Sequence, residues 1–385
     1  MRVLVDGMHL AHSAKGVGLY TDNVLTHLAR AEGVELSVLV LEGISADELR
    51  RLETLAAEVT VVPWHNHLWH GFRTLPQQVA RHRPEVVWMP YETPMARLRA
   101  PWLVICHDIP AELRRAQDAG GSAGSRRSRI GRLKDRLDDH LLGRSLRQAG
   151  FVGSNSQWVA ERLVRHFGVD PDRLLATPCA PADDFEGMSR RVDVAAVRRE
   201  LDLAEGFVFT IATGDPRENP RVVPEVFERV ASETALGLVV AGVRDHHRTE
   251  LEALYEGHPG RERVRFLPFL GPDRRFELAG LYTAAAVYLD PSLQEGFGMQ
   301  VVEAMACGTP VVCSDRGALP EVTAGAALLA DPTNADALAQ GVLALEHEPA
   351  KADALAQQGR ERSRVFDWGS TAQVVLDGLR RLASA

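Results

Sequence analysis

The stretch that decides the fold is PSLQEGFGMQVVEAMACGTPVVCSDRGALPEV, residues 291–322. Its short apolar runs, separated by Gly, Pro and Asp, predict a loop, a helix and a strand in that order. Two acidic residues, Glu295 and Glu303, interrupt the apolar pattern. Gly296 and Gly298 let a backbone approach a ligand closely, and the N-terminus of the helix that follows favours anionic or hydroxylated groups. The stretch therefore predicts a ligand site within an α/β fold.

The two carboxylates allow two interpretations. Glu303 lies among Val301, Val302 and Met305, where burying it without partners costs on the order of several kcal/mol. The two hydroxyls of a ribose would supply those partners. In the alternative interpretation, Glu295 is a solvated loop residue and Glu303 is a first-turn acid stabilised by the helix dipole. Two carboxylates that bracket Gly-Phe-Gly favour a sugar-nucleotide site.

The alternation of short apolar runs with helical patterns extends over the whole chain and predicts parallel sheets with crossover helices. It restarts after the Pro-containing segment 177–191. We therefore expect two Rossmann-like doubly wound domains, residues 1–185 and 190–365, followed by a C-terminal helix over 366–385. Strands are expected at 2–6, 36–42, 58–63, 85–90, 102–108 and 151–155, and at 207–213, 236–242, 263–269, 286–292 and 310–315.

Composition excludes several classes of protein. With 385 residues, 45% hydrophobic residues and a net charge of −8, the chain suits a globular protein and not a generic nucleic-acid binder. Its four cysteines form no C-x-x-C pair, and each lies in or beside an apolar run, as expected of reduced core thiols. Because no apolar window approaches the length of a membrane span, we expect a cytoplasmic protein.

Several segments of the sequence resemble those of a known family. Segment 290–322 closely resembles the E-x7-E signature of retaining GT-B glycosyltransferases of family four, and segments 5–29, 103–109 and 151–163 agree with that family in order and spacing. The resemblance implies two Rossmann-like domains that face each other across a cleft, with the C-terminal helix crossing back. The second domain would bind a nucleotide-sugar donor and the first an acceptor, with no cofactor and no metal.

The resemblance also assigns roles to residues of the opening stretch. It implies that Glu295 holds hydroxyls of the donor sugar and takes part in catalysis. The segment Gly296-Phe297-Gly298 would approach the sugar and the phosphate, and Glu303 would bind the ribose of the nucleotide.

The first domain contributes two further candidates near the ends of strands. Lys15-Gly16-Val17-Gly18 follows the first strand and predicts a Gly-rich loop able to cover a diphosphate. His107 ends a strand, at the carboxyl edge where sites form. It is either a bystander beside a helix-capping Asp108 or, as the resemblance implies, a catalytic residue against the donor sugar and the acceptor.

The run PWHNHLWHGF, residues 63–72, gathers aromatic and histidine side chains. A metal site is one interpretation, but no second cluster of acids or cysteines supports it. Trp64, His67 and Trp69, with Tyr20 elsewhere in this domain, are expected to contact an acceptor by stacking or hydrogen bonding. Core packing is the alternative.

One position departs from the family pattern. The turn TGDPREN, residues 213–219, carries Glu218 where the family usually has a lysine that meets the donor diphosphate. A carboxylate about 4 Å from a diphosphate is repelled by roughly 1 to 4 kcal/mol. Either Glu218 turns away while Arg217, Lys15 or Arg244 neutralises the phosphates, or the donor is unusual, or catalysis is lost.

The function implied is transfer of a hexosyl group from a GDP- or UDP-sugar to a small-molecule or glycan acceptor, with retention and by front-face displacement. The alternatives are a phosphorylase-like reaction on the same fold and a degenerate donor site in a non-catalytic partner subunit.

A basic segment, residues 112–136, is compatible with an anionic acceptor or with acidic lipid headgroups. Its low-complexity part, 116–132, is expected to be a loop. We expect a soluble acceptor and disfavour membrane association, because a loop would lack the exposed Trp, Phe or Leu face of an interfacial helix.

Overall fold

A computed structural model describes residues 1–10, 16–110, 112–114, 129–181, 185–203 and 206–385. The chain forms two compact units. The first unit contains the described residues of 1–111, 127–179 and 367–385, and the second contains those of 112–126 and 180–366. The chain leaves the first unit after Cys179 and returns to it at Asp367.

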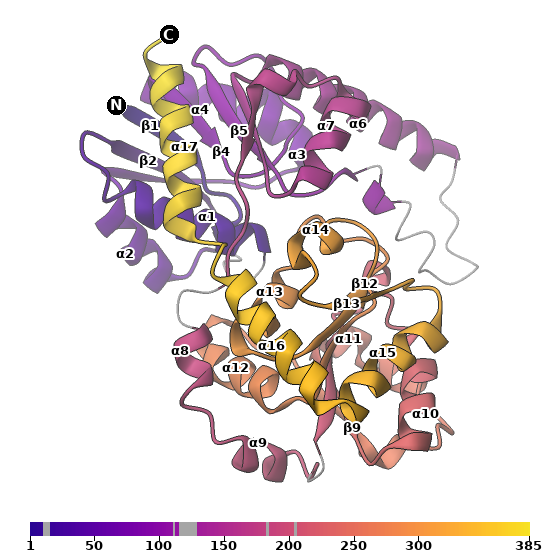
Figure 1. The fold of residues 1–385 in the computed structure, drawn as a ribbon. Helices are drawn as coiled ribbons and strands as arrows, with labels where there is room; N and C mark the ends of the chain where they lie inside the picture. Colours follow the sequence, from indigo (N-terminus) through magenta and orange to yellow (C-terminus); the bar gives the residue numbers. More distant parts are fainter. Residues whose placement is uncertain (11–15, 111, 115–128, 182–184, 204–205) are drawn as a thin grey trace. The chain divides into compact units, whose positions relative to one another are not determined.

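The first unit is built on a parallel seven-stranded sheet with the order β3-β2-β1-β4-β5-β6-β7 (Figure 1). Its strands are β1 (Arg2–Asp6), β2 (Glu35–Leu41), β3 (Glu58–Val62), β4 (Val86–Met89), β5 (Trp102–Cys106), β6 (Phe151–Ser154) and β7 (Leu174–Ala176). In register, Val3 pairs with Leu36 on one side of β1 and with Val86 on the other.

Helices connect these strands. They are α1 (Gly16–Leu28), α2 (Ala46–Leu55), α3 (His67–Trp69), the π-helix η2 (His70–Thr74), α4 (Leu75–His82), α6 (Arg129–Gln148), α7 (Gln157–Phe167), the 3-10 turn η3 (Pro171–Arg173) and the C-terminal α17 (Trp368–Ala383). Helix α17 packs within the first unit, against α1 and strands β4, β5 and β7. Its Thr371 hydroxyl donates to the Pro178 carbonyl at 2.8 Å, which ties the helix to the end of the segment after β7.

The second unit has a parallel six-stranded sheet with the order β10-β9-β8-β11-β12-β13. Its strands are β8 (Phe207–Ile211), β9 (Gly237–Val243), β10 (Val264–Pro268), β11 (Val287–Asp290), β12 (Val311–Ser314) and β13 (Leu328–Ala330). Its helices are α8 (Phe185–Ser189), α9 (Val194–Glu200), α10 (Val223–Glu233), α11 (Asp245–Ala253), α12 (Arg275–Ala284), α13 (Met299–Cys307), α14 (Leu319–Thr323), α15 (Ala335–His347) and α16 (Pro349–Ser363). The 3-10 turns η4 (Pro216–Glu218), η5 (Arg261–Arg263) and η6 (Pro272–Arg274) complete it.

Burial explains why the apolar runs become strands. Strands β4, β5, β6, β9, β11 and β12 are buried at every residue, as parallel strands covered by helices on both faces must be. Each run predicted as a strand overlaps one to within a few residues, and the expected fold of two Rossmann-like domains is confirmed. Strands β7 and β13 were not predicted, since each has only three residues.

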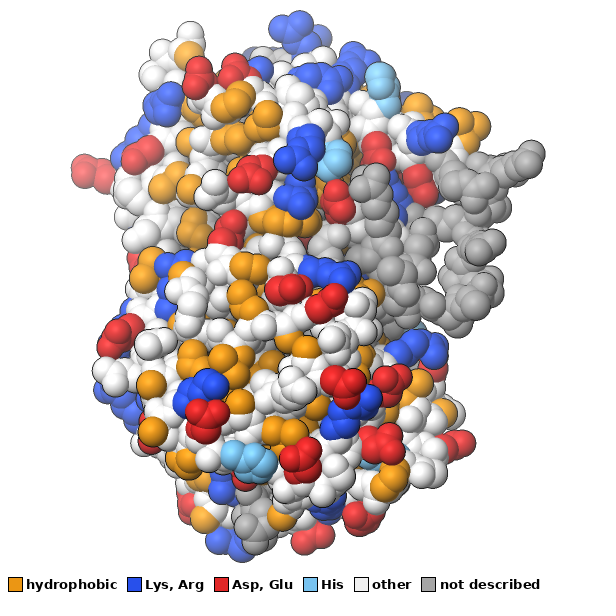
Figure 2. Space-filling view, turned by 45° about the vertical axis from the view of Figure 1, so that its right-hand side comes forward, with side chains coloured by type: hydrophobic (Ala, Val, Ile, Leu, Met, Phe, Trp, Pro, Cys, Tyr) orange, Lys and Arg blue, Asp and Glu red, His pale blue; other side chains and the backbone are white. Residues whose placement is uncertain are grey.

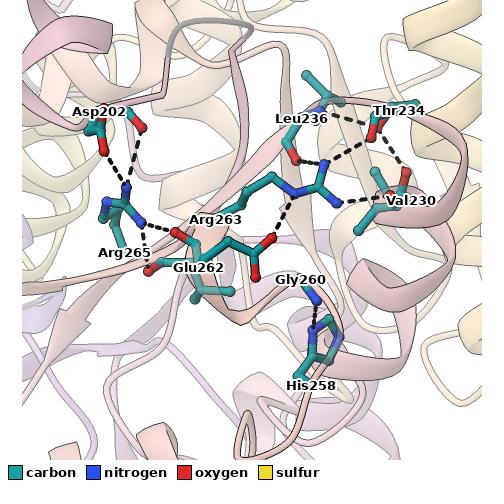
Figure 3. Close-up of polar contacts among 11 residues, drawn as sticks. Asp202, Val230, Thr234, Leu236, His258, Gly260, Glu262, Arg263 and Arg265 are labelled. Atoms are coloured by element: carbon teal, nitrogen blue, oxygen red, sulfur yellow. Dashed lines mark hydrogen bonds and ion pairs between the residues drawn. The ribbon is translucent and has the colours of Figure 1, made fainter.

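Arginines of β10 and the turn before it bind helix ends in the second unit (Figure 3). The Arg263 guanidinium donates to the carbonyls of Ala231, Thr234 and Leu236, at the end of α10 and just before β9. Arg265 donates to the carbonyls of Leu201 and Asp202, just past the end of α9. Terminal carbonyls of a helix lack partners within it, and a guanidinium satisfies several at once.

The face of the molecule in Figure 2 has acidic and basic side chains interspersed over its described part. All four cysteines are buried and free, as expected. Among the described helices, none combines the length and the apolar character needed to cross a bilayer.

Candidate functional site

The sheet of the second unit reverses its strand order between β8 and β11. Ligands of doubly wound folds bind beyond the carboxyl ends of the strands at such a point. Strand β8 leads into the turn 213–219, and β11 ends at Asp290 and leads into the loop 291–298. Residues 291–298, with Glu295 and the two glycines, therefore lie at the position where this fold places ligands.

Hydrogen bonds tie these two connections together. The Leu293 amide donates to the Arg217 carbonyl at 2.7 Å. The Asn219 side chain, on a residue with φ of +55°, donates to the carbonyls of Pro291 and Pro332 at 3.2 and 2.7 Å. The turn after β8 and the loop after β11 thus form one framework.

Two glycines fix the loop that carries Glu295. A Cβ on Gly317 would lie 2.5 Å from the Glu295 carbonyl oxygen, which itself accepts a hydrogen bond from the Ala318 amide at 2.9 Å. Gly298 has φ of +91° and immediately precedes α13, and a Cβ there would lie 2.3 Å from Leu319 Cδ2. Both positions require glycine, so the loop can lie directly against the start of α13.

Glu303 is buried in the middle of α13, where it is 8% exposed. One carboxylate oxygen accepts a hydrogen bond from the Tyr282 hydroxyl at 3.1 Å. Burial raises the pKa of Glu303 to about 7, while the Tyr282 hydrogen bond and the charge of Arg275 oppose that shift. Glu303 is thus a buried carboxyl group with capacity for further hydrogen-bond donors.

The acidic residues of this region all act electrostatically on one buried side chain, Tyr288. The charges of Asp290, Glu303, Glu295 and Glu218 all act on the buried Tyr288 hydroxyl, and together with burial they hold its pKa well above the usual value. Glu295 itself is half-buried. Phe297, by contrast, is 4% exposed and packs edge-on against Phe366, so its side chain belongs to the core.

Glu218 folds back onto its own turn. Its two carboxylate oxygens accept hydrogen bonds from the Thr213 amide at 2.6 Å and the Thr213 hydroxyl at 2.7 Å. Burial raises the pKa of Glu218 to about 7, against the effect of these bonds. Arg217, the nearby candidate cation, is paired with Asp215 at 2.9 Å.

The sheet of the first unit reverses its order between β1 and β4. Asp6, the last residue of β1, meets His70 there, with 2.9 Å between the Asp6 carboxylate and His70 Nε2. Both are buried, and the Asp6 carboxylate raises the pKa of His70 although burial, the largest single effect, lowers it. Asp6 Oδ1 and His70 Nδ1 are buried and have no hydrogen-bond partner among the described residues.

His107 lies at the end of β5, one strand further along this sheet. Its Nε2 is 2.8 Å from the Pro90 carbonyl, which can only accept, so Nε2 carries the proton and Nδ1 is left as an acceptor. Burial lowers the pKa of His107 to about 4, so the imidazole is neutral at physiological pH.

Tyr20 is fully buried, contrary to what an acceptor contact requires. Its ring packs edge-on against His107 and Trp368, with ring centroids 4.7 and 5.5 Å apart. Gly16 and Gly18 form the first turn of α1 and not a loop, while Lys15 lies outside the described residues. Tyr20 therefore supports His107 from the core.

Trp64, His67 and Trp69 lie on and just before α3, where all three are exposed. The Trp64 ring is 5.0 Å from His67, and His65 is 5.2 Å from Trp69. Among the described residues, no group of three or more His, Cys, Asp and Glu is arranged to hold a metal ion. The exposed rings are available for stacking.

Sequence reasoning missed the residues that support the site. Tyr282, which binds Glu303, comes from α12 and carries no motif of its own. The sequence predicted Thr213 only as part of a turn and Asp6 only as part of a strand. A weak signal existed for Asp6, since an acid at the end of an apolar strand lies at the edge where sites form.

Two family models together match most of this chain. Residues 14–180 match the model "Glycosyltransferase Family 4", and residues 196–362 match "Glycosyl transferases group 1". The chain belongs to the family 4 glycosyltransferases. The first model covers strands β2 to β7 of the first unit, and the second covers all of β8 to β13, so the two halves of the family's architecture are both present.

Similar proteins support this assignment. The glycosyltransferase is 30% identical over 254 residues to the O-antigen chain mannosyltransferase B of Escherichia coli, covering 65% of this chain and 66% of that protein. It is 32% identical over 237 residues to a D-inositol 3-phosphate glycosyltransferase of Rhodococcus opacus, covering 59% of this chain and 52% of that protein. The matches thus span about half to two thirds of these relatives.

Solved structures share the fold. Sucrose-phosphate synthase from Thermosynechococcus elongatus has a TM-score of 0.75 at 19% identity, over 100% of this chain and 99% of that one. HepE of Anabaena, solved in complex with UDP and glucose, has a TM-score of 0.72 at 18% identity, over 99% of this chain and 100% of that one.

Proposed function

We propose that this protein transfers a hexosyl group from a GDP- or UDP-sugar to a small-molecule or glycan acceptor, with retention of configuration. The observation that carries the proposal is Glu303, a buried carboxyl group near the switch point of the second unit that accepts a hydrogen bond from the neutral Tyr282 hydroxyl. A nucleotide ribose offers two hydroxyl donors to such a group.

In this proposal the second unit holds the donor. Glu303 binds the ribose and Glu295 binds hydroxyls of the sugar, because the two lie on either side of the N-terminus of α13. The amides of Gly296, Phe297 and Gly298 meet the sugar and the phosphates. The Phe297 side chain, packed on Phe366, fixes that backbone without contacting the ligand.

The chemistry we propose is front-face displacement. The bond between the sugar C1 and the diphosphate oxygen breaks as the acceptor oxygen bonds to C1 from the same face, and the leaving diphosphate takes the acceptor's proton. Dipoles of the α13 amides stabilise the charge that develops on the diphosphate. Arg217, and Lys15 from outside the described residues, are the cations proposed to meet it.

The first unit is proposed to bind the acceptor. Exposed Trp64, His67 and Trp69 supply stacking surfaces and hydrogen bonds. His107, neutral and oriented by the Pro90 carbonyl, offers Nδ1 as a fixed acceptor for a hydroxyl group of a substrate. Its proposed role is orientation, since a group with a pKa of about 4 is a poor proton donor at pH 7.

A donor screen tests this function. Purified protein is incubated with GDP-mannose, GDP-glucose, UDP-glucose and UDP-N-acetylglucosamine, and release of the free nucleotide is measured with Glu295→Ala as control. We expect slow hydrolysis of one donor, abolished in the variant.

The position of Glu218 favours a second candidate, a non-catalytic subunit with a degenerate donor site. Absence of both hydrolysis and nucleotide binding would support that candidate.

A further inference from the structure

Helix α6 exposes a basic face with large apolar side chains. Its exposed residues whose side chains are described are Leu133, Lys134, Arg136, Leu137, His140, Arg144, Arg147 and Gln148. No acid is among them, because Asp135, Asp138 and Asp139 are half-buried. Leu133 and Leu137 are 69% and 54% exposed and, with His140 and Arg144, follow the i, i+4, i+7, i+11 spacing of one helix stripe.

A second segment of the first unit has the same character. Residues 59–84 contain no acidic residue. Trp69 and Phe72 are 44% and 40% exposed, and the Arg73 guanidinium lies 5.1 Å from the Trp69 ring. Residues 95 and 96 link this segment to α6, because the Ala96 amide donates to the Gly71 carbonyl at 3.1 Å and the Met95 amide donates to the Ser145 hydroxyl of α6 at 2.8 Å.

These two segments concentrate the exposed apolar side chains of the described residues. Of the ten large hydrophobic side chains exposed there, six belong to residues 61–72 and 133–137. Scattered exposed hydrophobics are ordinary on a protein surface, but a gathered set marks an interaction site. We call the exposed residues of 61–73 and of 133–148 the basic apolar face.

We propose that the basic apolar face docks on the surface of a bilayer that contains anionic phospholipids. Leu133, Leu137 and Phe72 enter the headgroup boundary, while Lys and Arg on the same face meet lipid phosphates. A nucleic acid would match the positive charge of this face but would leave Leu133 and Leu137 without an apolar environment.

This proposal reverses an expectation from the sequence. Membrane association was disfavoured because residues 116–132 were expected to be a loop without an exposed apolar face. Residues 116–128 lie outside the described residues, but α6 begins at Arg129, within the expected loop, and carries Leu133 and Leu137 on its exposed side.

Vesicle sedimentation with the full chain tests the proposal. Binding to vesicles of phosphatidylcholine with about 30% phosphatidylglycerol, which have a negative surface, is compared with binding to vesicles of pure phosphatidylcholine. Both are measured at low and at high salt. We expect most of the protein to sediment with anionic vesicles at low salt and little with neutral vesicles. High salt is expected to release it, since screening weakens the attraction.

Paired variants locate the surface. Leu133→Ser with Leu137→Ser removes the apolar part, and Lys134→Glu with Arg136→Glu reverses the charge. Each pair is expected to lower the bound fraction at least fivefold. Matched controls in the second unit, Leu329→Ser and Arg199→Glu, change an exposed leucine and an exposed arginine and are expected to bind like the wild type.

Three results would overturn the proposal. One is wild-type protein that stays in the supernatant with anionic vesicles. Another is binding that neither α6 pair reduces, which would locate the lipid contact elsewhere. The third is concentration-dependent dimerisation of a protein that does not bind vesicles. If the Leu133→Ser with Leu137→Ser variant loses this dimerisation, the face is a contact between two copies of this chain. Circular dichroism melts of each variant establish that folding is unchanged.

Discussion

The two units have the same kind of sheet, but their switch points carry different chemistry. At the switch point of the first unit, the buried acid Asp6 is paired with a histidine, His70, at 2.9 Å. At that of the second unit, Glu303 and Glu218 accept hydrogen bonds from the neutral groups of Tyr282 and Thr213.

This difference separates structural from ligand-binding acids. A buried carboxylate beside a histidine has its partner within the protein, and removing that partner leaves an uncompensated charge. A buried carboxyl group served by a single hydroxyl keeps lone pairs for a ligand. We therefore propose that Asp6 and His70 stabilise the first unit and that Glu303 binds a ligand in the second.

The largest expected effect is on the structural pair. His70→Ala is expected to lower the free energy of unfolding by about 3 to 5 kcal/mol, because Asp6 remains buried without its partner. Urea denaturation followed by circular dichroism measures this. The double variant Asp6→Asn with His70→Ala is the control, and it should recover part of the loss. A His70→Ala variant of wild-type stability and reduced turnover would move the pair from structure to catalysis.

The next largest effect is expected from His107, which lies at the end of β5 in the first unit. His107→Ala is expected to lower turnover about 100-fold, because a fixed substrate contact is lost, while nucleotide affinity stays within twofold. Initial rates and titration calorimetry on the same preparations measure the two. His107→Gln, which keeps hydrogen-bonding capacity, is expected to retain more turnover. Unchanged rates in His107→Ala would make this histidine a bystander.

The pH dependence of nucleotide binding tests Glu303. Burial raises its pKa to about 7, so the neutral form prevails below pH 7 and the carboxylate above it. Ribose hydroxyls donate to the carboxylate, and affinity for GDP or UDP is therefore expected to rise about tenfold from pH 6 to pH 8.

The nucleotide's own terminal phosphate titrates in this range, near pH 6. Glu303→Gln is the control, since it keeps the phosphate's contribution and removes that of the carboxyl group. Identical pH profiles for wild type and Glu303→Gln would contradict a role for Glu303 ionisation.

Glu218 is expected to give the smallest effect. Glu218→Lys adds a cation in the turn after β8 and is expected to tighten nucleoside diphosphate binding by about threefold to tenfold, on the scale of one partly screened charge. Glu218→Gln keeps an acceptor for Thr213 and is expected to change affinity by less than twofold. Weaker binding in Glu218→Lys would indicate that Glu218 contacts a cationic group of the donor.

The fold was largely predictable because burial on both faces of a parallel strand leaves a continuous apolar run. Such a run is visible in RVLVD or WLVIC, but not in the three residues of β7 or β13. The start of α6 was missed because Gly, Ser and Arg around residues 120–132 match loop composition.

The candidate site was less predictable than the fold. Glu295 and Glu303 stand out as acids in an apolar run, and the charges of both help to raise the pKa of the buried Tyr288. Tyr20 appeared to be a ligand contact only because nothing local in the sequence distinguishes a buried tyrosine on α1 from an exposed one. Contacts such as Tyr282 with Glu303 join different elements, and spacing along the chain does not encode them.

Calorimetric titration of bare GDP and UDP into wild type, Glu303→Ala and Glu295→Ala tests the central claim most directly. We expect one nucleotide to bind the wild type, about 100-fold weaker binding in Glu303→Ala, which loses charged hydrogen bonds to the ribose, and binding within twofold of wild type in Glu295→Ala. Glu303→Gln is expected to lie between. Equal losses in the two alanine variants, or no loss in Glu303→Ala, would contradict the assignment of Glu303 to the ribose and Glu295 to the sugar.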